Sequence, residues 1–293
     1  MGPILVLSLG PALLLLWMLV RWDAKRPEPP GSVTRVVLLG VATCIPAGVI
    51  ELVEKAVLGD VVDVQGKFLD AFFIAALTEE TLKLLVVLLY LWKKPHFDEV
   101  MDGILYTAAA SLGFAMLENV LYVGNNVGTG VLRAFTAVPL HATASGMMGY
   151  CVGRAKFSPG ASTLWVLGGL GVAVGVHGTY DWAVMSEGVF GFGEGSPLLA
   201  LLEVVVIVIV CSAALYGLSR HALALDDALL GPHSRPLPGV GAPRPYAGMP
   251  VTVVSTDGGR YPARILSGRG HHYLCTMSDG RTVWIPWQNV APA

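Results

Sequence analysis

Ionisable side chains lie inside long apolar stretches of this sequence, where such residues are rare. The residues whose types suit acid–base chemistry or metal binding are Glu79, Glu80, Lys83, Glu118, Asn119, His141, His177 and Asp181. A charged side chain at the centre of a bilayer costs roughly 2.5 to 3.5 kcal/mol. We therefore expect these groups to face one another or a cavity that holds water.

Helical spacing supports this convergence within each stretch. Glu79 and Lys83 are four residues apart, as are His177 and Asp181, so each pair shares one face of its helix. Small residues recur in the stretches that hold the two histidines: Ala142, Ser145, Gly146, Gly149, Gly171 and Gly175. Because such residues let helix backbones approach closely, we expect His141 to lie near His177.

Composition indicates that lipid is the main solvent of the chain. Hydrophobic residues make up 54% of the 293 residues and charged residues 14%, against roughly 25% charged residues in an ordinary soluble domain. A helix needs about 20 apolar residues to cross a bilayer. We predict an all-α multi-pass membrane protein with about seven transmembrane helices, near residues 3–20, 36–58, 68–92, 103–123, 132–151, 164–185 and 198–218.

The positions of the charges predict an orientation in the cell membrane. Basic residues occupy alternate gaps between the apolar blocks: Arg21, Lys25, Arg26, Arg35, Lys93, Lys94, Arg154, Lys156 and Arg220. Because positively charged loops stay on the cytoplasmic side, we expect the N-terminus outside and the C-terminus in the cytoplasm. Arg133 is the one charge that dissents. The net charge of −2 gives no field that would attract nucleic acid, so no such partner is expected.

The chain changes character after its seventh apolar block. Residues 1–220 form the predicted transmembrane domain, and residues 221–248 form a linker that can begin with a short amphipathic helix. Residues 249–293 show short alternating runs broken by Asp257-Gly258 and Asp279-Gly280, which are strong hairpin signals. We expect five short strands in a small all-β, SH3-like or Tudor-like barrel.

The aromatic residues of this predicted barrel allow two interpretations. They are Tyr261, Tyr273, Trp284 and Trp287. They can fill a small core, or they can line a groove for a peptide partner, and the sequence leaves both open.

Four motifs follow one another in the transmembrane part. Residues 79–83 read EExxK, residues 113–119 read GFAxxEN, His141 stands alone in the next block, and residues 177–181 read HxxxD. In kind, order and placement this set resembles the PrsW family, which is similar to the wider group of membrane-embedded CAAX-type proteases. That group has EExxxR and FxxxH where this chain has EExxK and Phe114-xxx-Glu118, so the resemblance favours PrsW.

The resemblance covers residues 1–220 and implies an intramembrane protease. It also implies a single-pass membrane protein as substrate, such as an anti-sigma factor. The C-terminal barrel lies outside the resemblance and is expected to be an appended module.

The chemistry expected of EExxK is activation of water for hydrolysis of a peptide bond. Two adjacent carboxylates in a low dielectric do not both ionise easily, so Lys83 would hold one of them charged. We expect Glu80 to be the base that activates the water, with Glu79 as its partner.

Polarisation of the peptide carbonyl can occur with or without a metal. A zinc site would take His141, His177 and a carboxylate from Glu118 or Asp181, with an open position for water. Without zinc, the two histidines and Asn119 would donate hydrogen bonds to the oxyanion, and Asp181 would orient His177.

Three other interpretations compete with proteolysis. The ionisable residues can be buried ion pairs and satisfied core histidines, although such pairs only roughly break even against apolar residues. A transporter or proton pathway also buries Glu, His and Asp at mid-membrane, but it often shows repeated halves, and no convincing repeat is found. A membrane-anchored scaffold or sensor would act through the barrel and would not need Glu80.

Overall fold

The computed structural model describes residues 2–59, 63–123, 126–157, 160–186, 197–230, 250–255, 259–269, 272–286 and 289–292. The chain divides into two compact units, Met1–Ala222 and Leu223–Ala293. The first is helical and the second contains a β-sheet. The predicted linker, residues 231–248, lies outside the described residues, and residues 221–230 continue the last long helix instead of forming a separate amphipathic one.

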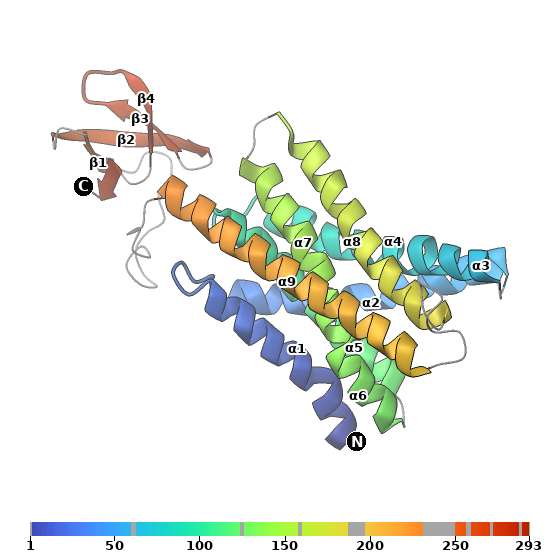
Figure 1. Cartoon of the computed structure of the whole chain (residues 1–293). Helices are drawn as coiled ribbons and strands as arrows, with labels where there is room; N and C mark the ends of the chain where they lie inside the picture. The colour runs from blue at the N-terminus through green and yellow to red at the C-terminus, as the bar shows by residue number, and fades with distance from the viewer. Residues whose placement is uncertain are drawn as a thin grey trace. The chain divides into compact units, whose positions relative to one another are not determined.

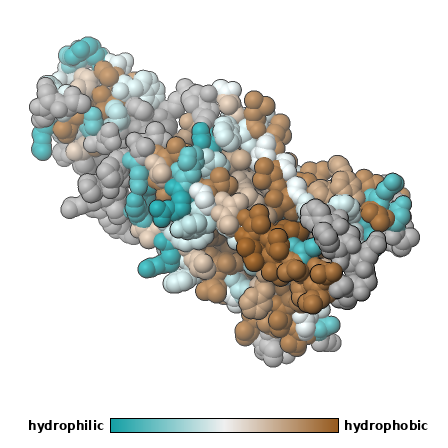
Figure 2. Space-filling model, viewed as in Figure 1, coloured by the Kyte–Doolittle hydropathy of each residue, from teal (hydrophilic) through white to brown (hydrophobic). Residues whose placement is uncertain are grey.

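Five described helices are long and apolar enough to cross a membrane. They are α1 (Gly2–Trp22), α2 (Pro30–Leu58), α5 (Val100–Val123), α8 (Ser162–Ser186) and α9 (Pro197–Leu230), all visible in Figure 1. These helices confirm the predicted multi-pass membrane architecture. Figure 2 shows apolar side chains spread over much of the visible face of the helical unit, as contact with lipid requires.

The third and fifth predicted segments are helical too, although neither is among the five helices above. The third is a continuous run of α3 (Val64–Leu69), η1 (Asp70–Ala76), α4 (Leu77–Val86) and η2 (Val87–Leu91). The fifth consists of α6 (Val127–Phe135) and α7 (Ala137–Phe157). The elements η1 and η2 have π-helical geometry, which is frequent at functional sites and here flanks the EExxK motif on both sides.

Helix α5 is the central element of the helical unit. In its membrane-type span, 94% of the residues are buried, against 22% for α2 and 17% for α1. It packs against α1, α2 and α7, and α7 packs in turn against α8. This arrangement carries the side chains of α5 and α7 into the protein interior and away from lipid.

Small residues let the helices pack most closely, and some of these residues differ from those expected from the sequence. An added Cβ at Gly149 of α7 would lie 2.2 Å from the Gly103 carbonyl oxygen of α5, so those two backbones are in direct contact. Gly171 and Gly175 have open space beside them. On α8 the close contacts are at Gly169 and Gly178 instead, because these two positions face α7 and η1.

The second unit is an antiparallel five-stranded sheet with the order β4-β3-β2-β1-β5. Its strands are β1 (Pro250–Val254), β2 (Arg260–Arg269), β3 (His272–Met277), β4 (Thr282–Pro286) and β5 (Val290–Pro292). The sheet curls into a half-barrel, which confirms the predicted small all-β module. Its core is formed by Val251, Val253, Ala263, Ile265 and Cys275.

The aromatic residues of the sheet divide between core and surface. Tyr273 packs against the core, whereas Tyr261 and Trp284 are each 45% exposed. The predicted turn at Asp279-Gly280 is present, with Gly280 at φ +83°, a conformation that suits glycine. The other predicted turn, Asp257-Gly258, and Trp287 lie outside the described residues.

Candidate active site

The site begins with three side chains on one face of α4. Glu79, Glu80 and Lys83 are buried, and Glu80 and Lys83 have no exposed surface. The Lys83 ammonium donates hydrogen bonds to Glu79 Oε2 and Glu80 Oε1, each at 2.9 Å. The spacing of three and four residues along α4 produces this fork, because such side chains lie on the same side of a helix.

Two histidines from neighbouring helices complete the centre. His141 of α7 places Nδ1 3.1 Å from the Lys83 ammonium, and His177 of α8 places Nδ1 3.0 Å from Glu80 Oε1. Their rings are 4.9 Å apart and nearly perpendicular. The expected convergence of the two histidines is therefore present in the structure.

Each histidine contacts a carboxylate with its other nitrogen. His141 Nε2 lies 2.7 Å from Glu118 Oε2 of α5, and His177 Nε2 lies 3.3 Å from Asp181 Oδ2, one turn further along α8. Both rings thus direct Nδ1 toward α4 and place Nε2 near an outer carboxylate, and His177 Nε2 also lies 3.9 Å from Glu79 Oε2 of α4. Such carboxylates fix the tautomer and the orientation of an imidazole.

Arg133 is a site residue that the sequence analysis did not identify. This α6 side chain pairs with Glu118 Oε2 at 2.8 Å and donates from Nε to Asn119 Oδ1 at 2.7 Å. Its guanidinium also lies 4.3 Å from the centre of the Tyr122 ring. The available signal in the sequence was its dissent from the positive-inside pattern.

Ser145 and Phe114 are two further contacts of the centre. Ser145 donates to Glu80 Oε2 at 2.5 Å, and the Lys83 ammonium lies 4.1 Å from the centre of the Phe114 ring. Ser145 follows His141 by four residues, so helical spacing places both on the same face of α7. In the sequence, this spacing from His141 was the signal that Ser145 belongs to the site.

Among the described residues, four side chains of this centre can hold a metal ion together. Glu79, Glu80, His141 and His177 each offer a ligand atom, and these atoms all lie within 4.8 Å of one another. The expected zinc ligands Glu118 and Asp181 stand behind the histidines instead, where they contact Nε2. A set of two carboxylates and two imidazoles, with carboxylates behind the imidazoles, suits the ligand chemistry of zinc.

The charge balance of the site also suits a divalent cation. The carboxylates of Glu79, Glu80, Glu118 and Asp181 are accompanied by the basic groups of Lys83 and Arg133. With both histidines neutral, two negative charges remain uncompensated in a buried setting. A divalent ion, or protonation of both histidines, restores neutrality.

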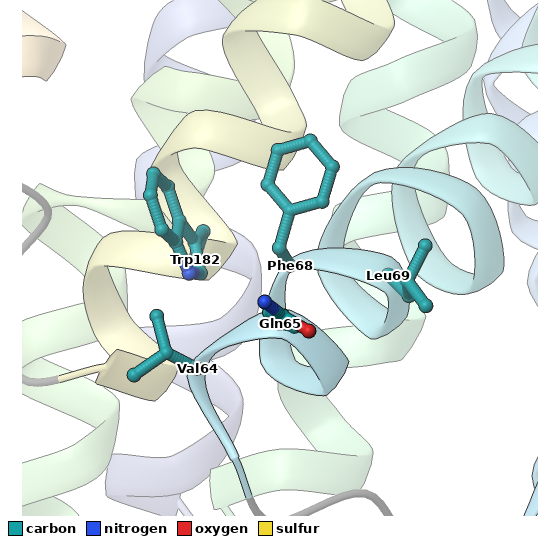
Figure 3. Close-up of a pocket in the computed structure, with 5 residues that line it drawn as sticks. All are labelled: Val64, Gln65, Phe68, Leu69 and Trp182. Carbon is teal, nitrogen blue, oxygen red and sulfur yellow. The ribbon is translucent and has the colours of Figure 1, made fainter.

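An apolar pocket of about 450 Å³ opens at the surface between α3 and α8. It is lined by Val64, Gln65, Phe68 and Leu69 of α3 and by Trp182 of α8, as Figure 3 shows. The Phe68 and Trp182 rings meet edge to face at 5.5 Å. Trp182 directly follows Asp181, the carboxylate that contacts His177.

The fold and the site define a multi-pass membrane protein with a buried centre of carboxylates and histidines, and sequence comparison identifies its family. Residues 28–214 match the family described as PrsW family intramembrane metalloprotease. The chain therefore belongs to the PrsW family of intramembrane proteases. The match contains every residue of the centre and ends before the β-sheet unit.

Individual relatives agree with the family assignment. The chain is 36% identical to Protease PrsW of Geobacillus kaustophilus (strain HTA426) over 66% of this chain and 85% of that protein. It is also 36% identical to Protease PrsW of Bacillus subtilis (strain 168), over 62% of this chain and 83% of the relative. No solved structure matches the chain significantly.

Proposed function

We propose that this protease hydrolyses a peptide bond of a membrane protein with a water that Glu80 activates. The observation that carries the proposal is the fixation of Glu80 from three helices. Lys83 of α4 and His177 of α8 contact Oε1, and Ser145 of α7 donates to Oε2. A base held in this way is preorganised, so little reorganisation is needed when it takes a proton.

The proton transfers can be assigned to residues of this chain. Glu80 takes a proton from water as the oxygen attacks the carbonyl carbon, and it returns that proton to the departing amine as the C–N bond breaks. Glu79 shares Lys83 with Glu80 and is 6% exposed. It is the alternative base, and substitution of each glutamate separates the two assignments.

Asn119 is proposed to stabilise the oxyanion. Its Oδ1 accepts from Arg133, which leaves the amide N–H groups to donate. Asn119 is fully buried, and its Nδ2 has no hydrogen-bond partner in the described part of the chain. An unpaired buried donor is costly in the resting protein and can be used by a developing negative charge.

A metal fits this site, and zinc is the proposed ion. His141, His177 and Glu79 would hold it, Glu80 would remain the base, and the ion would supply Lewis-acid chemistry when bound. Glu118 and Asp181 would orient the histidines through Nε2. In this structure the Lys83 ammonium provides the positive charge among the same groups.

The substrate is proposed to be a single-pass membrane protein. The apolar surface of the helical unit supports this proposal, because a substrate helix can approach through lipid. An anti-sigma factor is the substrate class suggested by the resemblance to PrsW.

We further propose that the N-terminus lies outside and the β-sheet unit in the cytoplasm, because the basic residues occupy alternate gaps between the apolar blocks. The exposed Tyr261 and Trp284 support the proposal that this unit binds a peptide partner.

The test is cleavage of single-pass membrane peptides by the purified protein. The wild type is expected to cut at least one peptide, and His177→Ala is expected to lose about 10²-fold or more in rate. Chelator should abolish the wild-type activity, and added zinc should restore it. Activity that persists after complete metal removal would contradict the zinc proposal, whereas undiminished cleavage by His177→Ala would contradict the site.

A further inference from the structure

A second group of carboxylates lies at the opposite end of α5 from Glu118. It contains Glu28, from the segment between α1 and α2, Asp98 and Glu99 just before α5, and Asp102 in the first turn of α5. Asp102 precedes Glu118 by 16 residues, which is about 24 Å along a helix. This acidic group is therefore separate from the EExxK centre.

Several contacts organise this acidic group. Asp102 Oδ2 accepts hydrogen bonds from the backbone N–H groups of Asp98 and Glu99, at 2.7 and 2.9 Å. The Tyr106 hydroxyl donates to Glu28 Oε2, and Arg26 pairs with Glu99. These contacts hold the carboxylates in place, but they leave Asp102 Oδ1 buried with no hydrogen-bond partner among the described residues.

Asp23 supplies a second and independent observation. Its side chain is only 1% exposed, and among the described residues its carboxyl group has a side-chain partner only in another carboxyl group, that of Glu99. Asp23 nevertheless points into the acidic group, because its ligand atom lies within 4.8 Å of those of Glu28 and Asp102. A buried carboxylate without a donor is unfavourable unless something else neutralises it.

The charge of Arg26 offsets that of Asp23 only in part, because burial and Glu99 act more strongly on Asp23. Arg26 forms its ion pair with Glu99, and the Lys156 ammonium donates to the Trp92 carbonyl at 2.8 Å. Burial, and then the charge of Glu99, raises the pKa of Asp23 to about 10. Such a carboxyl holds a proton at neutral pH, and a bound cation would take the place of that proton.

We propose that Asp23, Glu28 and Asp102 bind a hard divalent cation, calcium or magnesium. Three carboxylates with neither histidine nor cysteine form a ligand set that favours these ions over zinc. Glu28 is partly exposed, so water can reach the ion and complete its coordination. The ion would join the segment after α1 to the first turn of α5, the helix that carries Glu118 and Asn119 to the active site.

Terbium luminescence tests the proposal on the full-length protein in detergent. Tb³⁺ prefers oxygen ligands as calcium does. Trp22 precedes Asp23 in the sequence, and the Tyr106 hydroxyl contacts Glu28, so both aromatic rings can sensitise the luminescence of a bound Tb³⁺ ion. The wild type should give saturable emission that calcium or magnesium displaces. Asp23→Asn and Glu28→Gln, each checked for folding by circular dichroism, should lose at least about tenfold in Tb³⁺ affinity.

The active-site variants Glu79→Gln and His177→Ala are the matched controls and should keep the emission. Thermal unfolding adds a second readout, in which calcium or magnesium should raise the Tm of the wild type but not that of Asp23→Asn. The proposal is overturned if the wild type shows no saturable emission. It is also overturned if Asp23→Asn and Glu28→Gln bind Tb³⁺ as the wild type does, or if the active-site variants alone lose the signal.

Discussion

Each of the two histidines of the candidate active site contacts a carboxylate, one near it in the sequence and one far from it. Asp181 lies four residues from His177 on the same helix, so helical spacing alone predicts their contact. Glu118 reaches His141 from another helix and is itself held by Arg133. The orientation of His141 therefore depends on three elements, which makes Arg133 a positioning residue.

Substitution of Arg133 tests this dependence. Arg133→Gln removes the ion pair with Glu118 and the hydrogen bond to Asn119, and we expect kcat to fall by roughly 10- to 100-fold with a small change in KM. Arg133→Lys keeps the charge and should recover part of the loss. A change in thermal stability with unchanged kcat would show that Arg133 only supports the fold.

At the residue scale, the sequence predicts the members of the centre better than their partners. The types and spacing of Glu79, Glu80 and Lys83 identify them because ionisable residues in apolar helices are rare. Arg133 and Ser145 could not be found in the same way. Arg133 lies near the end of a short helix, and Ser145 is an ordinary helix residue until Glu80 approaches it from α4.

The close contact of α5 with α7 is the element-scale feature on which the site depends, because these helices carry Glu118 and His141. Gly149→Ala would place a Cβ 2.2 Å from the Gly103 carbonyl oxygen, so the helices must separate. We expect a loss of roughly 1–3 kcal/mol in stability, measured by thermal unfolding in detergent.

The matched control for this prediction is Gly171→Ala on α8. Gly171 has open space around it, so an added methyl group meets nothing. Its stability should stay the same or rise slightly, because alanine favours helix more than glycine does. Equal losses in both variants would contradict a specific contact between α5 and α7.

At the element scale, apolar length predicts where the helices lie but not their details. The π-helical turns on both sides of α4 leave no clear mark in the hydropathy pattern. The continuation of α9 to Leu230 was also missed, because its last residues resemble a separate amphipathic run. The strands of the second unit were easier to predict, because alternation and a glycine turn both mark them.

The whole molecule combines a protease unit with a sheet unit that lies outside the family match. Residues 28–214 cover the match, whereas the sheet begins at Pro250. All the active-site contacts lie within the first compact unit. Deletion of the sheet unit therefore leaves the region of the family match intact.

Deletion of residues 246–293 tests this separation. We expect kcat for short membrane peptides to stay within about twofold of the intact chain, because the α4, α7 and α8 contacts remain. KM for a full-length partner should rise if the sheet docks it. A loss of kcat on short peptides by a folded truncated protein would show that the sheet unit belongs to the catalytic machinery.

The most direct measurement of the central claim is kcat for one cleavable single-pass peptide with the wild type, Glu80→Gln and Glu79→Gln, all shown to be folded. Activation of water by Glu80 predicts that Glu80→Gln lowers kcat by about 10²- to 10⁴-fold while the peptide still binds. Glu79→Gln should retain more activity than Glu80→Gln. Undiminished cleavage by Glu80→Gln would contradict the account.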